Sequence, residues 1–307
     1  MNISIVIPVY NGESTVEKLA EEIFNSFENS NYTFEIIFVH DCGPDNSLPL
    51  LLALETKHKD AIKVVKLTRN FGQHNAIIAG FEYCSGELII TMDEDLQHLP
   101  SDIIKLIIKQ KEGDYDIVYG KYKSLEHSGF RSLTSVALKK ILSWSIPDLD
   151  KEYSAFRIIK AEIAKETIAM RNSYTFLDGY LSWITKNTSH TLVQHQERYG
   201  GVSSYGVKTL IEHSINILIT FSNLPIRILS YTAISTFIIT FIYSLYIIFR
   251  KLMYNDLSSG YPTLIISIGM GVSLVLLGLG ILGEYIYRIN LKTTKRPNYC
   301  VKKSIDD

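Results

Sequence analysis

Several common signature motifs are missing from this chain of 307 residues. No Gly-x-Gly-x-x-Gly follows the first apolar segment, and no Gly-Lys-Ser or Gly-Lys-Thr occurs in the sequence. Their absence excludes the usual dinucleotide-binding and P-loop sites. The formal net charge of −1 also gives no sign of the basic surface that a nucleic-acid partner requires. We therefore expect no nucleic-acid partner.

Cysteine is scarce as well. Cys42, Cys84 and Cys300 are far apart in the chain and odd in number. This usage is typical of a reducing compartment and indicates neither a disulfide framework nor a zinc site.

Charge is absent from two long stretches, Ile228–Phe249 and Leu257–Gly283. Because about 20 consecutive apolar residues cross a bilayer, we predict transmembrane helices at 228–249 and 262–287, joined by a short non-cytoplasmic loop at 250–261. The alternative is a pair of buried helices in the core of a soluble protein.

The flanking residues predict an orientation for these spans. Lysine and arginine are concentrated in 288–307, which we expect to form a basic cytoplasmic tail. Two spans return the chain to the same side, so the N-terminal domain is expected to be cytoplasmic too. No basic segment precedes Ile3, and no signal peptide is therefore expected.

Apolar strand patterns alternate with helical patterns in the first two thirds of the chain. The predicted strands are Ile3–Val9, Phe34–Val39, Ile62–Leu67, an apolar segment within 86–92, and Asp116–Tyr119. This alternation predicts a doubly wound, mostly parallel sheet, in which ligands bind outside the carboxyl ends of the strands. The unusual polar clusters all follow strands: Tyr10-Asn11, Asp41, Arg69-Asn70 and Asp93-Glu94-Asp95. We expect one crevice to collect them.

The acids after the fourth strand are the most informative cluster. Asp93 and Asp95 alternate, and Gln97 follows two residues later. Such oxygen ligands at the end of a rigid strand suit Mg²⁺ or Mn²⁺, which also bind the oxygens of a phosphate. The alternative is an acidic helix cap, in which Asp95 or Ser101 begins the following apolar helix.

The pattern changes from Arg131 onward. An apolar stripe after Arg131 predicts an amphipathic helix, either packed on the sheet or lying at a membrane interface, and 207–227 predicts a second, juxtamembrane one. Arg157 lies within a strand pattern between Phe156 and Ile158. An arginine in that setting is either a salt-bridged structural residue or a ligand for a phosphate.

Several segments together point to a known family. They are Ile7–Asn11, Asp41–Asp45, Leu67–Gly72, Met92–Gln97, Phe156-Arg157, Gly283–Tyr285 and Arg296–Tyr299. In this order and spacing they resemble the family 2 glycosyltransferases that load a sugar onto a polyprenyl phosphate. The resemblance implies an α/β fold of the GT-A type, with a Rossmann-like, mostly parallel sheet in a cytoplasmic domain at 1–206, amphipathic interface helices and two C-terminal transmembrane helices.

The resemblance also implies roles for particular residues. Donor binding is implied for Pro8, Tyr10, Asn11, Asp41, Asp93, Glu94, Lys121 and Arg198. A divalent cation, Mg²⁺ or Mn²⁺, is implied at Asp93, Asp95 and Gln97. The phosphate of the acceptor is assigned to Arg131 and Arg157, and catalysis to Asp95 and Arg157.

The sequence departs from the family pattern at some positions. His40 replaces the first aspartate of a pair, and Cys42-Gly43-Pro44 replaces the usual glycine and serine. Ala155 stands where many relatives carry an aspartate considered catalytic. A phosphate monoester, with a second pKa near about 6, is mostly a dianion at neutral pH and needs no general base. We therefore expect direct displacement with inversion, driven by electrostatics and orientation.

The expected activity is transfer of a sugar from a nucleotide-diphosphate sugar, with a UDP-sugar favoured, to undecaprenyl or another polyprenyl phosphate at the cytoplasmic membrane face. The product would be a lipid-linked monosaccharide for cell-surface glycan modification. The alternatives are a processive polysaccharide synthase and an inactive membrane scaffold. We also expect a multi-pass protein of the bacterial inner membrane that contacts membrane lipids and forms a homo-oligomer, such as a tetramer, through its glycine-rich second span.

Overall fold

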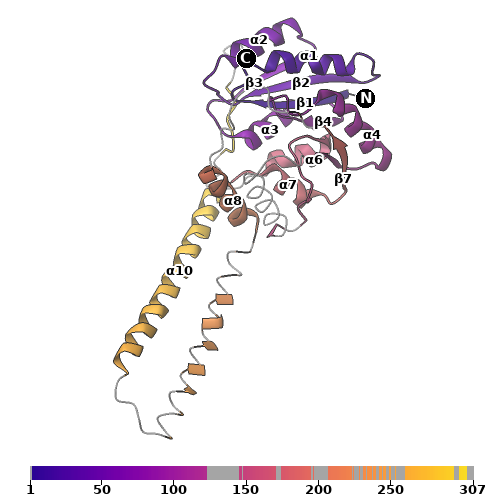
Figure 1. Cartoon of the computed structure of the whole chain (residues 1–307). Coiled ribbons are helices and arrows are strands. Elements are labelled where there is room, and N and C mark those ends of the chain that lie inside the picture. Colours follow the sequence, from indigo (N-terminus) through magenta and orange to yellow (C-terminus); the bar gives the residue numbers. More distant parts are fainter. Residues whose placement is uncertain are drawn as a thin grey trace.

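The computed structural model of the protein describes residues 2–122, 145–146, 148–170, 174–194, 196, 207–222, 260–293 and 297–302, with scattered residues between 224 and 253. The first part of this chain forms an α/β domain around one sheet, and α10 (Tyr261–Thr293) extends away from it (Figure 1).

The sheet has seven strands in the order β3-β2-β1-β4-β6-β5-β7. Their bounds are β1 Asn2–Val9, β2 Thr33–His40, β3 Ile62–Lys66, β4 Leu88–Thr91, β5 Ile117–Tyr122, β6 Arg157–Lys160 and β7 Thr188–Val193. Only β6 runs against its neighbours, because it pairs antiparallel with both β4 and β5. The other pairs are parallel. The sheet is therefore mixed, and the start of β6 reaches the same edge as the ends of the parallel strands.

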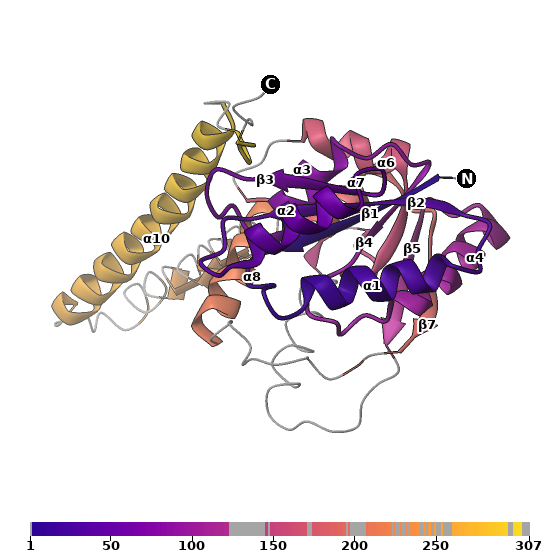
Figure 2. The same cartoon turned by 90° about the horizontal axis from the view of Figure 1, so that it is seen from above.

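Helices cover both faces of the sheet (Figures 1 and 2). On one face lie α1 (Val16–Phe27), α2 (Ser47–Lys57) and α4 (Ile103–Gly113), the last preceded by a short 3-10 helix, η1 (Pro100–Asp102). On the other lie α3 (Gln73–Phe81), α6 (Ala161–Glu166) with the 3-10 helix η2 (Thr167–Ala169), α7 (Leu177–Ile184) and the C-terminal end of α8 (Val207–Phe221). The central strands are consequently apolar on both faces.

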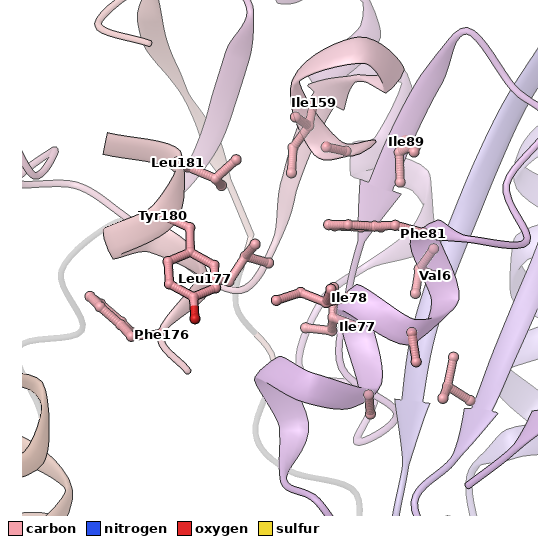
Figure 3. Close-up of a cluster of buried hydrophobic side chains, with 14 of the residues drawn as sticks. Val6, Ile77, Ile78, Phe81, Ile89, Ile159, Phe176, Leu177, Tyr180 and Leu181 are labelled. Atoms are coloured by element: carbon pink, nitrogen blue, oxygen red, sulfur yellow. The ribbon is translucent and has the colours of Figure 1, made fainter. Parts of the chain in front are cut away.

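The alternation of side chains along β2 divides the core into two clusters. Ile36 and Phe38 pack with α1, whereas Ile37 and Val39 pack with α3, as the two-residue period of a strand requires. Figure 3 shows the second cluster, where Phe81 of α3 lies opposite the side chains of α7. A Cβ on Gly80 would lie 2.9 Å from Val39 Cγ2, so this glycine lets α3 approach the sheet closely. The close approach is at the C-terminal end of α3, because Gly80 is the second-last residue of the helix.

The C-terminal segment returns to the edge of the sheet. Val301 bridges Leu67, the Thr68 amide donates to the Cys300 carbonyl at 2.9 Å, and the Lys302 amide donates to Lys66 at 2.8 Å. This pairing covers the edge of β3, whose backbone groups would otherwise be open to another chain. Arg288 ties α10 to α8 through Thr220 and Asn216, at 2.9 and 3.1 Å.

The prediction of two transmembrane helices is wrong. Within the parts of the chain that the structure describes, no helix combines the length with the apolar character that crossing a membrane requires. The prediction rested on the absence of charge over two stretches. That is a weaker criterion than a helix that is both long and strongly apolar. The segment 228–249 is described only in part, and 262–287 lies within α10.

Candidate active site

The strand-end loops meet at one edge of the sheet. Tyr10 follows β1, Asp41 follows β2 and Asp93 follows β4, and these three strands run parallel. The Tyr10 amide donates to Glu94 Oε1 at 3.5 Å, which joins the first loop to the acidic one. The topology therefore brings together the residues that the sequence pattern placed in one crevice.

A compact turn from Asp93 to His98 holds the acidic residues. Asp93, Glu94 and Asp95 are half-buried, and Leu96 adopts a left-handed conformation with φ 60°. The Gln97 amide donates to Asp95 Oδ1 at 3.2 Å. The side-chain amide of Gln73, at the start of α3, donates to Asp93 Oδ1. The carboxylates are thus oriented by contacts inside the turn and from α3.

The acidic turn carries an excess of negative charge. Burial, and then repulsion from Asp93, raise the pKa of Glu94 to about 7. Burial and the same aspartate raise the pKa of Tyr122 on neighbouring β5. A cation at the turn would relieve this repulsion.

The donor set fits a metal that is shared with a substrate. The described residues contain no group of three or more aspartate, glutamate, histidine or cysteine side chains that could hold a metal ion by themselves. Mg²⁺, however, keeps several waters and commonly binds one or two carboxylates together with substrate phosphates. Asp93 and Asp95, with the amide oxygen of Gln97, match that requirement in chemistry.

Asp41 organises the loop before α3. Its buried carboxylate accepts hydrogen bonds from the amides of Phe71 and Gly72, at 2.7 and 2.8 Å. Gly72 has φ 87°, a left-handed conformation that favours glycine. Burial raises the pKa of Asp41, while the two amides act against that shift. The contact of Asp41 with a nucleotide base or ribose stays a prediction.

The loops after β1 and β2 pack directly on each other. Gly43 lies against the Tyr10 carbonyl so closely that a Cβ there would overlap the oxygen. Glu13 accepts from the Asn46 amide at 3.2 Å, and its own amide donates to Asp45 at 2.9 Å. Gly43, one of the residues at which the sequence departs from the family pattern, therefore lies directly against the backbone of Tyr10, a residue that is 39% exposed.

Arg157 is sealed inside the domain. It is 1% exposed, and its guanidinium pairs with Asp178 of α7 and donates to the Thr91 hydroxyl at 3.1 Å. The Thr91 hydroxyl in turn donates to the Ala155 carbonyl at 2.6 Å. Buried Tyr119 lies alongside, with its ring centre 5.8 Å from the guanidinium. Asp178 and Thr91 hold the guanidinium in this structure, and the contact of Arg157 with a phosphate stays a prediction.

The other predicted basic residues divide into described and undescribed ones. Lys121 lies near the end of β5 and pairs with Glu152 at 3.1 Å, with both side chains more than a third exposed. Arg131 and Arg198 lie outside the described residues.

Sequence reasoning missed Gln73, His98 and Asp178. Asp178 is a lone acid in the apolar segment 176–181, just as Arg157 is a lone base in an apolar strand. Two isolated charges of opposite sign in apolar segments are a usable signal for a buried pair. Gln73 and His98 carried no such signal, because polar residues near a loop are common.

Comparison with known proteins agrees with this geometry. The chain matches the model of glycosyl transferase family 2 over residues 4–156. The putative glycosyltransferase CsbB of Bacillus subtilis (strain 168) is 33% identical, over 98% of this chain and 92% of that protein. The undecaprenyl-phosphate 4-deoxy-4-formamido-L-arabinose transferase of Shewanella sediminis (strain HAW-EB3) is 32% identical, over 98% of this chain and 91% of that protein.

A solved structure supports the fold. Glucosyl-3-phosphoglycerate synthase from Mycobacterium tuberculosis, in complex with Mn²⁺ and UDP-glucose, superposes with a TM-score of 0.51 at 16% identity, covering 71% of this chain and 77% of that one. A mixed α/β sheet with an acidic turn after its central strand is the architecture of a GT-A-type enzyme. With relatives above 30% identity over almost the whole chain, the protein belongs to glycosyl transferase family 2.

Proposed function

We propose that the protein transfers a sugar from a nucleotide-diphosphate sugar, with a UDP-sugar favoured, to undecaprenyl phosphate or a similar polyprenyl phosphate. The product is a lipid-linked monosaccharide for modification of cell-surface glycans. The observation that carries this proposal is the position of the acidic turn Asp93–Gln97 beside the loops that follow β1 and β2. The named activity of the 32% identical relative supports the choice of acceptor.

The donor occupies the edge formed by the first two strand loops. Pro8, Tyr10 and Asn11 hold the base region together with Asp41, and the half-exposed ring of Tyr10 offers a stacking surface. Lys121 and Arg198 contact the diphosphate. Because Lys121 pairs with an exposed glutamate in a high-dielectric setting, exchanging that partner for a phosphate costs little.

The acidic turn serves the leaving group. A bound Mg²⁺ or Mn²⁺ at Asp93, Asp95 and Gln97 would neutralise the charge of the departing nucleotide diphosphate. Gln73 and the Gln97 amide hold the two aspartates in place for this role. Glu94, which accepts a hydrogen bond from the Tyr10 amide, joins this turn to the donor-binding loop after β1.

The acceptor needs positioning more than activation. Its phosphate is already mostly a dianion at neutral pH, which is consistent with Ala155 at the position of a base in relatives. Arg131 is proposed to dock that phosphate by bidentate hydrogen bonds. Arg157 contributes either by exchanging Asp178 for the phosphate or by holding the strand ends around Thr91. Displacement then proceeds with inversion at the anomeric carbon.

The acceptor also sets where the reaction occurs. A polyprenyl chain remains in a bilayer, so the crevice must work at a membrane surface, and nucleotide sugars place that surface on the cytoplasmic side. Contact with membrane lipids and assembly into a homo-oligomer remain predictions.

The test is transfer by the full-length protein in detergent with Mn²⁺ or Mg²⁺. Labelled UDP-, GDP- and dTDP-sugars are offered with undecaprenyl phosphate, and undecaprenol without phosphate is the matched acceptor control. We expect a labelled lipid only with the phosphate, and an inverted anomeric configuration. Equal labelling of undecaprenol, or retention of configuration, would contradict the proposal.

A further inference from the structure

The backbone of the acidic turn is closed by one side chain. The Asp93 amide donates to Nδ1 of His98 at 3.2 Å, so the imidazole spans the turn from its last residue to its first. Asp93 is also the first of the proposed metal ligands. The orientation of its backbone is therefore linked to His98.

The imidazole is itself held firmly. His98 is 4% exposed, and its ring lies nearly parallel to two aromatic rings. The ring centre is 5.1 Å from that of Phe156 at 11°, and 5.9 Å from that of Tyr122 at 7°. Phe156 precedes β6 and Tyr122 ends β5, so the stack joins the acidic turn to the neighbouring strands. A ring fixed in this way places its Nδ1 at a defined point.

The hydrogen bond also defines the protonation of the ring. An amide N–H can donate only to an imidazole nitrogen that carries no proton, so Nδ1 must be the acceptor and the proton of the neutral ring is on Nε2. A side chain without an acceptor at this point would leave the Asp93 amide without that partner inside a half-buried turn.

We infer that His98 is a positioning residue: its Nδ1 holds the Asp93 amide and thereby fixes the acidic turn in the shape that receives the metal-bound diphosphate. This inference rests on the proposed function for its consequence in catalysis. The geometry of the turn itself is independent of that function and can be tested separately.

Two matched substitutions separate the hydrogen bond from the stacking. His98→Phe keeps an aromatic ring but has no acceptor. His98→Asn loses the ring but places Oδ1 at the same number of bonds from the backbone as Nδ1. If the hydrogen bond positions the turn, Asn should restore what Phe loses; if stacking alone matters, Phe should be the milder change.

The first readout needs neither metal nor sugar transfer. Hydrogen exchange of the Asp93 amide in the metal-free protein should be about tenfold faster in His98→Phe than in the wild type, and close to wild type in His98→Asn. ¹⁵N spectra of the wild-type imidazole should show Nδ1 unprotonated. A protonated Nδ1, or unchanged exchange in His98→Phe, would overturn the inference even if the protein transfers no sugar.

The second readout tests the consequence at the site. Mn²⁺ binding in the presence of UDP should weaken about tenfold in His98→Phe and recover within about threefold in His98→Asn. The turnover number should follow the Mn²⁺ affinity, while the KM for polyprenyl phosphate stays unchanged. A smaller loss in His98→Phe than in His98→Asn, at thermal stabilities that match, would show that the ring and not its acceptor matters, and would contradict the inference.

Discussion

The acidic turn Asp93–His98 and the Arg157–Asp178 pair lie close to Thr91 at the same sheet edge. They differ in charge, because the pair is neutral as a whole whereas the turn carries excess negative charge. Arg157 and Asp178 are 1% and 3% exposed and neutralise each other. The acids of the turn are half-buried, and their mutual repulsion is strong enough to contribute to a Glu94 pKa of about 7. A balanced, sealed pair stabilises one structure, whereas an unbalanced, accessible cluster is suited to binding a cation.

The largest effect is expected at the accessible cluster. Asp95→Asn removes a charge from the proposed metal site, and we expect sugar transfer to fall at least about a hundredfold. The free energy of unfolding should change by less than about 0.5 kcal/mol, because the aspartate is half-buried. The side-chain oxygen of the asparagine can also still accept the hydrogen bond from the Gln97 backbone amide. Transfer assays and urea unfolding measure the two quantities. A comparable loss in wild type with EDTA would assign the effect to metal.

The sealed pair should show the reverse pattern. Asp178→Leu leaves the Arg157 guanidinium buried without its counter-charge, and we expect about 3–5 kcal/mol loss in the free energy of unfolding. Adding Arg157→Met should recover most of that loss, since neither charge then remains. A folded double variant with unchanged KM for polyprenyl phosphate would show that Arg157 does not dock the acceptor. A raised KM would support the predicted phosphate contact.

Asp41 differs from both, because it is a buried carboxylate held by backbone amides and not by a cation. In Asp41→Asn one side-chain oxygen can still accept a hydrogen bond from the amide of Phe71 or Gly72. The other oxygen is replaced by an NH₂ group, which cannot accept the bond from the second amide. We expect about 1–2 kcal/mol loss of stability, measured by urea unfolding. If Asp41 also contacts the nucleotide, the KM for the donor should rise in the same variant.

The smallest effect is expected for substitution of Glu35, which lies near the amino-terminal ends of the strands. Burial alone would raise the pKa of Glu35, but hydrogen bonds from Ser4 and Ser85 lower it below the usual 4.5. Glu35→Gln should cost about 1 kcal/mol at neutral pH and leave transfer unchanged. Because the folded pKa is depressed, the difference between wild type and variant should be fully present above about pH 4.5 and vanish as the pH falls through the folded value. A difference that grows on acidification would contradict this account.

Much of the sheet and the position of the site follow from the sequence. Apolar runs with turn residues after them mark β1 to β5, and parallel strands bring Tyr10, Asp41 and Asp93 to one edge. The antiparallel direction of β6 did not follow, since side-chain periodicity carries no information on strand direction. That reversal is what brings Ala155 and Arg157 to the site.

Contacts between distant segments were the least accessible. The hydrogen bond from Gln73 to Asp93, the stacking of His98 on Tyr122 and Phe156, and the pairing of the C-terminal segment with β3 depend on tertiary packing. The transmembrane prediction failed for a different reason. It used uncharged length as its criterion, and the described helices do not combine length with sufficient apolar character.

The proposed cation site at the acidic turn is best tested by measuring Mn²⁺ binding in the presence of UDP. Electron paramagnetic resonance would monitor that binding to the wild type, to Asp95→Asn and to the Arg157→Met/Asp178→Leu variant. We expect saturable binding to the wild type, loss of that binding in Asp95→Asn, and wild-type affinity in the double variant. Wild-type affinity in Asp95→Asn would contradict the assignment of the cation to the acidic turn.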